Sequence, residues 1–145
     1  MKTLLLALSF VLAALPVSAA ETAAAPPTPS VAKDSRCFEL RTYTALPGRL
    51  EALNARFRDH TSALFQKHGI GIVGFWMPTD AEQGATNKLV YLLVHQSREA
   101  AKKSWDAFRT DPEWNKARTE SEASGRIVEK VESVYLSATD YSPMK

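Results

Sequence analysis

The sequence is poor in the residues and motifs that usually reveal an enzyme. Its 145 residues include one cysteine, Cys37, and three histidines. A single cysteine excludes a disulfide within the chain and a zinc site built from several cysteines. The histidines form no HxH or HxxxH pair, and the chain has no P-loop, glycine-rich dinucleotide motif or GxSxG. The sequence therefore predicts no metal site and no bound cofactor.

The sequence also has no strong excess of positive or negative charge. Lys and Arg number 18 and Asp and Glu number 16, which gives a formal net charge of +2, and these residues are spread along the chain. Nucleic-acid-binding domains usually concentrate Lys and Arg on one face or stripe. We therefore expect no nucleic-acid partner.

Only one long apolar run is present, and it lies at the N-terminus. Leu4 to Leu15 follows Lys2 and is ended by Pro16 and the small residues of 17–20. This pattern is typical of a secretory signal peptide over residues 1–20. The run is shorter than the roughly 20 apolar residues that span a bilayer. We therefore predict an exported protein, periplasmic or secreted, without a stable membrane anchor.

Residues 21–35 are rich in Ala, Pro, Ser and Thr and contain no aromatic residue. Such a segment buries too little apolar surface to offset the entropy lost on ordering. We expect it to be a disordered tether. The folded domain is then predicted to cover residues 36–145, a length that suits one small domain.

Within that domain, apolar periodicity separates strands from helices. Strands are predicted at 37–43, 70–77, 88–95 and 127–138, and helices at 47–68, 98–109 and 111–124. The order β-α-β-β-α-α-β predicts an α+β, ferredoxin-like domain, with a four-stranded antiparallel sheet and helices on one face. The other face of the sheet is left open.

Alternation along the strands sorts their side chains onto two faces. We expect the wholly aliphatic sets to pack against the helices, which assigns the mixed set to the open face: Glu39, Arg41, Tyr43, Tyr91, His95, Ser133 and Tyr135. The second strand does not decide between Phe75 and Trp76. A second copy of the sheet would cover this face and close a lined interior, so we predict a homodimer. The tyrosines alone are equally consistent with a plain interface.

Several short segments of the sequence, taken in their order along the chain, resemble the motifs of one family. They are ELRTY at 39–43, Pro47-Gly48, His68-Gly69, Gly74-Phe75-Trp76, Asn87 and DPEW at 111–114. The set resembles the NIPSNAP family over nearly all of residues 37–145. The resemblance implies a dimeric α/β barrel, whose superfamily includes cofactor-free monooxygenases, haem-handling enzymes and small lyases. Where relatives often carry Trp-x-Tyr, this sequence has Leu93-Val94-His95.

These observations predict a protein that binds a small, partly apolar molecule inside its barrel. Arg41 would orient an anionic or carbonyl oxygen, with Tyr43, Tyr91 and Trp76 as walls and His60 at the pocket edge. His95 would be the catalytic proton acceptor if the protein performs cofactor-free oxidation or proton transfer. The sequence leaves open whether the protein is an enzyme.

Three alternatives remain at this level. His60 and His95 are each also consistent with an ordinary, hydrogen-bonded histidine of the fold. The predicted tether is also consistent with a non-catalytic ligand carrier or a protein-interaction module. A haem-handling protein would use His60 or His95 as an axial ligand.

Overall fold

The computed structural model describes residues 30–145. The predicted signal peptide, and the tether as far as residue 29, lie outside the described residues. The strands are β1 (Cys37–Ala45), β2 (Gly71–Trp76), β3 (Lys88–His95) and β4 (Val128–Ser137). The helices are α1 (Leu50–Arg56), η1 (Phe57–Thr61), α2 (Ser62–Lys67), η2 (Ala81–Gln83), α3 (Arg98–Thr110) and α4 (Pro112–Ser121).

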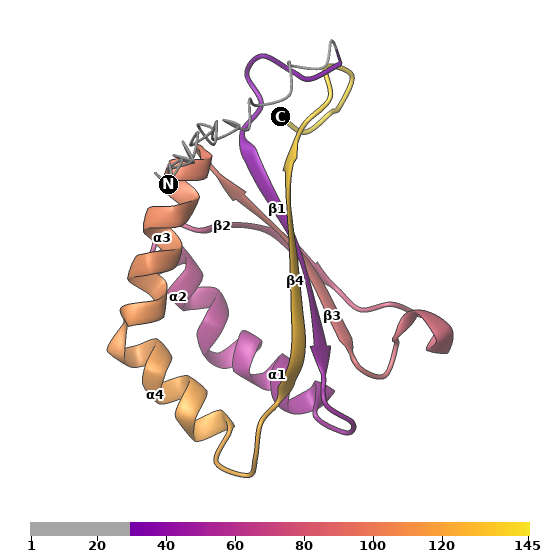
Figure 1. Cartoon of the computed structure of the whole chain (residues 1–145), viewed down its shortest axis with the longest axis vertical. Helices are drawn as coiled ribbons and strands as arrows, with labels where there is room; N and C mark the ends of the chain where they lie inside the picture. Colours follow the sequence, from indigo (N-terminus) through magenta and orange to yellow (C-terminus); the bar gives the residue numbers. More distant parts are fainter. Residues whose placement is uncertain (1–29) are drawn as a thin grey trace, which may run out of the picture.

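The four strands form one antiparallel sheet in the order β2-β3-β1-β4. The helical segments α1 to α4 pack on one side of this sheet, and the other side carries none of them (Figure 1). Two residues of types that favour the N-cap position start the later helices: Ser97 accepts from Ala100 N at 3.1 Å, and Asp111 accepts from Glu113 N at 2.7 Å. The predicted α+β, ferredoxin-like architecture is confirmed.

Residues 30–35, which are predicted to belong to the tether, pair with the C-terminal segment of the domain. Val31 forms a β-bridge with Thr139, and Ala32 N donates to Ala138 O at 2.9 Å. Asp140 N donates to Ser30 O at 2.8 Å. Composition predicts a tether here, but hydrogen bonds to the C-terminal segment hold residues 30–35, and one of them runs from Ala138 N to Ser35 Oγ at 2.7 Å.

The first helical segment is longer in the prediction than in the structure and is not uniform. It begins at Leu50 rather than Pro47, and η1 is a π-helical turn between α1 and α2. Two side chains bond back across five residues: Thr61 Oγ1 to Arg56 O at 3.1 Å, and Ser62 Oγ to Phe57 O at 2.8 Å. Such turns insert one extra residue and often lie at functional sites.

The predicted assignment of the two sheet faces is wrong. Tyr91 and Leu93 are fully buried beneath the helices, whereas Leu40, Val134 and Leu136 on the open face are 36%, 53% and 41% exposed. Alternation divides the side chains correctly, but it does not say which set the helices cover. The helices contribute four aromatic residues to the core: Phe57, Phe65, Trp105 and Phe108. The face of the sheet that contains Tyr43 and Tyr91 is the one that packs against them.

Strand β2 contains an irregularity that decides between Phe75 and Trp76. The register against β3 shifts between Ile72 and Gly74, so that Phe75 lies beside Tyr91 and Trp76 beside Val90. A Cβ on Gly74 would lie 2.8 Å from the Trp76 ring. Glycine therefore lets the Trp76 indole lie close against the strand on the open face, while Phe75 lies on the helical side against Phe57 and Tyr91.

Candidate functional site

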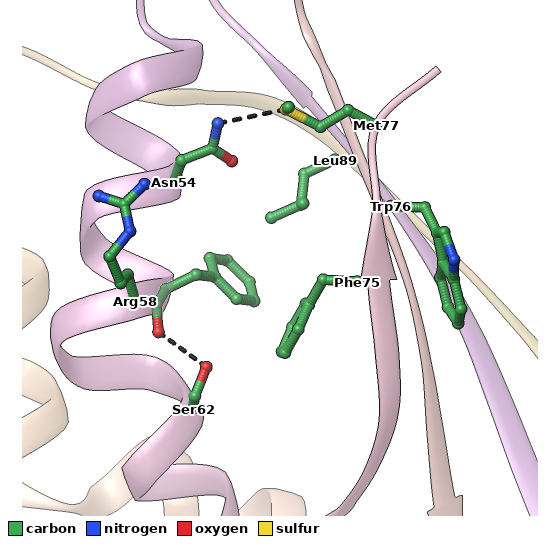
Figure 2. Close-up of a pocket in the computed structure, with 8 residues that line it drawn as sticks. Asn54, Arg58, Ser62, Phe75, Trp76, Met77 and Leu89 are labelled. Carbon is green, nitrogen blue, oxygen red and sulfur yellow. Dashed lines mark hydrogen bonds between the residues drawn. The ribbon is translucent and has the colours of Figure 1, made fainter. Parts of the chain in front are cut away.

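A cavity of about 490 Å³ opens between the first helical segment and strand β2 (Figure 2). We call it the aromatic pocket. Its lining comes from α1, η1, the start of α2, β2 and the residue after it, and β3: Asn54, Phe57, Arg58, Ser62, Phe75, Trp76, Met77 and Leu89. In Figure 2 the Asn54 side chain extends from the helix toward the strand, and Phe75 projects from β2 toward the helix.

Aromatic rings form the inner end of this pocket. The centroid of Phe57 lies 5.7 Å from that of Phe75 and 5.2 Å from that of Tyr91. Phe75 and Tyr91 are 5.6 Å apart, and Tyr43 meets Phe57 edge-on at 5.6 Å. Edge-to-face and tilted pairs at these separations are favourable. The pocket floor is thus held by a mutually packed aromatic group.

Polar groups lie on the helical side of the pocket. Asn54 Nδ2 donates to the Met77 sulfur at 3.3 Å, a weak contact that spans the pocket from helix to strand. Arg58 is exposed and reaches Glu51 only at 3.7 Å, so its guanidinium remains available to a ligand. The π-helical turn positions these groups, because Phe57 and Arg58 begin it and Ser62 follows it.

Trp76 contributes to the lining but not through its indole. Figure 2 shows the indole on the far side of β2 from the helices. Its side chain is 52% exposed. The prediction that Trp76 shares a wall with Tyr43 and Tyr91 is therefore wrong in placement, because the β2 irregularity turns it to the opposite face.

A second group of side chains surrounds the buried carboxylate of Glu39, which is 1% exposed. Its Oε1 accepts from Arg41 Nη1 at 2.7 Å and from Ser133 Oγ at 2.6 Å. Its Oε2 accepts from Trp105 Nε1 at 2.7 Å and lies 3.1 Å from His95 Nε2. We call these five residues the Glu39 cluster. Helix α3 covers it through Trp105.

Hydrogen bonding keeps this carboxylate ionised. Burial raises the pKa of Glu39, but the hydrogen bonds from His95, Ser133, Trp105 and Arg41 outweigh it and lower the pKa to about 2. Burial alone would lower the pKa of Arg41, yet the neighbouring Tyr91, Tyr43 and Glu39 raise it. Glu39 and Arg41 are therefore a charged pair at neutral pH.

Arg41 is fixed from several sides. Its Nε donates to the Tyr91 hydroxyl at 3.0 Å, and its guanidinium lies 4.4 Å from the centre of the Trp105 ring. Burial raises the pKa of Tyr91 well above its ordinary value, so the phenol stays protonated. The predicted grouping of Arg41, Tyr43, Tyr91 and His95 is found, but helix α3 and the aromatic core cover these residues instead of a partner sheet.

The two histidines of the prediction have different surroundings. His95 is 4% exposed, and its Nδ1 has no hydrogen-bond partner among residues 30–145. Because the ionised Glu39 carboxylate can only accept, Nε2 of His95 carries a proton and donates to it. His60 is exposed in a groove against α4, away from the sheet, because the π-helical turn puts Thr61 on the buried side.

Sequence reasoning missed the aromatic pocket itself. Phe57 lies in the predicted helix 47–68 and Phe75 in the predicted strand 70–77, but nothing in their spacing indicates that the two rings meet. Asn54, Arg58 and Ser62 had no motif, and the only available signal was a long helix followed by a short aromatic strand end. Within residues 30–145, no group of three or more His, Cys, Asp or Glu is arranged to hold a metal ion.

The described part of the chain contains no helix that is both long and apolar enough to cross a membrane.

The geometry defines a single α+β domain, with an aromatic pocket and a buried carboxylate cluster between its helical layer and its sheet. The NIPSNAP family model matches residues 38–143, and the chain belongs to the NIPSNAP family. A comparison with curated proteins found no match.

Solved structures agree with this fold. A NIPSNAP family protein of unknown function from Agrobacterium tumefaciens is 18% identical, with a TM-score of 0.69 over 80% of this chain and 99% of that one. An uncharacterised NIPSNAP-like domain protein from Burkholderia xenovorans is 16% identical, with a TM-score of 0.65 over 76% of this chain and 90% of that one. At these identities the likeness concerns the fold alone.

Proposed function

We propose that this protein binds a small, partly apolar molecule in the aromatic pocket. The observation that carries the proposal is an apolar wall left accessible beside polar groups: Phe75 is 36% exposed and Met77 is 51% exposed. Ligand sites are typically concave, mostly apolar and provided with a few polar groups that orient the ligand. The volume of about 490 Å³ suits a molecule of one or two rings.

The placement of the polar groups defines the kind of ligand. The apolar body would pack on Phe57 and Phe75, and a carboxylate or carbonyl oxygen would bind Asn54 and Arg58, which line the helical side of the pocket. This differs from the barrel interior expected from the sequence, because Arg41, Tyr91 and His95 lie on the helical side of the sheet and not on its open face. The site belongs to one chain and lies on the helical side of the sheet.

Substitution of Phe75 by serine is expected to weaken ligand binding by about 10- to 100-fold, since a buried aromatic contact contributes roughly 1.5 to 3 kcal/mol. Indole-3-acetate, a flat apolar ring with one carboxylate, is a suitable probe for titration calorimetry. Trp76→Phe is the matched control: it changes the neighbouring residue of the same strand, whose side chain points away from the pocket. Equal affinity in wild type and Phe75→Ser would contradict the proposal.

A catalytic role for His95 is a separate proposal. It is favoured by the unpartnered Nδ1 and by the Glu39 carboxylate behind Nε2, an arrangement that suits a proton acceptor. His95 does not line the aromatic pocket, so His95→Ala is expected to leave the affinity for the probe unchanged. Chemical change of a co-purified molecule, lost in His95→Ala, would indicate an enzyme, whereas binding without change would indicate a carrier.

Haem handling and protein interaction are the remaining alternatives. A haem absorbance band in the purified protein would favour the first. Capture of another protein chain, with no small molecule retained in native mass spectrometry, would favour the second. Both outcomes would count against the aromatic pocket as the main binding site.

We also propose that two copies pair through the open sheet face. One half of this face is apolar and at least partly exposed: Leu40, Val90, Leu92, Val94, Val134, Leu136 and Trp76. The other half carries Thr42, Thr44, Lys88, Lys130 and Glu132. Contiguous apolar surface of this kind is rare on monomers and marks an interface. A face that spans all four strands of one sheet suits a two-fold contact with itself.

Export remains a proposal that rests on residues 1–20 alone. If the signal peptide is removed, the mature protein recovered from the export compartment begins at or near residue 21, and its intact mass is lower by the mass of the missing segment. A chain of full length in the cytoplasm would contradict the proposal. The measurement requires only mass spectrometry of the protein from its own cell.

A further inference from the structure

A second cavity, of about 470 Å³, lies between helix α3 and the β1–β4 side of the sheet. It shares no lining residue with the aromatic pocket, which lies at the β2 edge. We call it the basic cleft. Its lining combines four cationic side chains with two carboxylates and a polar and aromatic floor: Arg41, Arg98, Lys102, Arg109, Glu39, Glu99, Ser133, Trp105 and Tyr135.

Most charges in the basic cleft already have partners. Glu39 is saturated by four donors, which include Arg41. Lys102 and Arg109 share one carboxylate, that of Asp106, with both contacts at 2.7 Å. Two cations on one exposed carboxylate leave a net positive charge on this side of the cleft. A further oxyanion would balance it.

Among the four cations of the cleft, Arg98 is the one that forms no ion pair with a side chain of residues 30–145. Its guanidinium lies 3.4 Å from the centre of the Tyr135 ring. Stacking on an aromatic face holds the planar group in one orientation and leaves its N–H edge for an acceptor. An arginine fixed in this way, at the mouth of a cavity, loses little entropy when it binds an anion.

We propose that the basic cleft binds a small organic oxyanion, a carboxylate or a phosphate, with Arg98 as its principal anchor and Lys102 and Arg109 as supporting charges. Glu99 opposes this binding, because its carboxylate lines the same cleft and repels an anion. The site is independent of the aromatic pocket. It gives the domain a second ligand on the other edge of its sheet.

Titration calorimetry with succinate and with inorganic phosphate, as separate probes, tests this inference on the mature protein. We expect saturable binding of at least one probe, weakened at least tenfold in Arg98→Ala and strengthened in Glu99→Gln. The control is Lys103→Ala, which removes an exposed cation from the same helix outside the cleft. Preference for succinate or for phosphate identifies the oxyanion.

The proposal would be overturned by absence of saturable binding to either probe, or by equal losses in Arg98→Ala and Lys103→Ala, which would indicate general electrostatic attraction. Glu99→Gln does not depend on the packing of Arg98, and unchanged affinity in this variant would also count against the cleft. Phe75→Ser is expected to bind these probes normally. Failure of the aromatic pocket is therefore distinguishable from failure of the basic cleft.

Discussion

Replacement of Glu39 by glutamine lowers the free energy of unfolding by about 3 to 5 kcal/mol, the usual cost of removing one partner from a buried charged group. The carboxylate presents only acceptors to its four partners. A glutamine amide keeps one oxygen but places an NH₂ group against some of these donors. Arg41 also retains a buried charge without its counter-ion, which adds to the loss.

Chemical denaturation followed by circular dichroism measures this effect. Glu120→Gln is the matched control, since Glu120 lies on α4, away from the sheet, and is exposed, with Lys116 as its partner at 3.9 Å. Surface changes of this kind usually alter stability by less than about 0.5 kcal/mol. Similar stability of the two variants would show that the Glu39 cluster contributes little to the fold.

The same carboxylate sets a dependence on pH. The pKa of Glu39 is about 2 in the folded protein, against an ordinary value of 4.5. A folded-state pKa below the unfolded one adds stability above pH 4.5, and this contribution is lost as the pH falls from about 4.5 to 2. Glu39→Gln lacks this contribution, so its stability is expected to fall less over that interval than that of the wild type.

Replacement of Leu40 by arginine is expected to convert the proposed dimer into a monomer. Leu40 occupies a central strand, between Leu92 and Val134 on its neighbours. In a two-fold contact the change introduces two charges into one apolar interface. Burial of a charge without a partner costs several kcal/mol, which corresponds to at least about a thousandfold weaker association.

Sedimentation velocity over a range of protein concentrations measures the association. Val131→Arg is the matched control: Val131 is 42% exposed, close to the 36% of Leu40, but it lies opposite Tyr43 on the helical side of the sheet. A dimer that survives in Leu40→Arg, or a wild-type monomer, would contradict pairing through this face. Both variants are expected to remain folded, since the exposed side chains leave the core unchanged.

The comparison of sequence with structure separates two kinds of information. The spacing of apolar residues predicted four strands and the helical layer, because side chains on a strand or helix follow the geometry of their own backbone. The caps at Ser97 and Asp111 and the helix end at Gly69 are also local, and Gly69 has the positive φ of 71° that such an end uses.

The face of the sheet that the helices cover is not a local property. Alternation allows two arrangements, and the choice depends on whether a polar group can be satisfied once it is buried. Glu39 is buried because Arg41, Ser133, Trp105 and His95 reach it from three strands and a helix, a convergence absent from any single segment. The prediction that the helices cover the aliphatic side chains was wrong because no single segment shows that Glu39 can be satisfied when buried.

The sequence by itself determined the order of the elements, the α+β class and the grouping of Arg41, Tyr43, Tyr91 and His95 on one face. Only the tertiary structure decided that helices cover this group, that the π-helical turn exposes His60, and that Phe57 meets Phe75 across a pocket. The periodicity of apolar residues indicates the secondary structure of a single segment. A pocket depends on which segments meet and on the polar groups that their contact can satisfy.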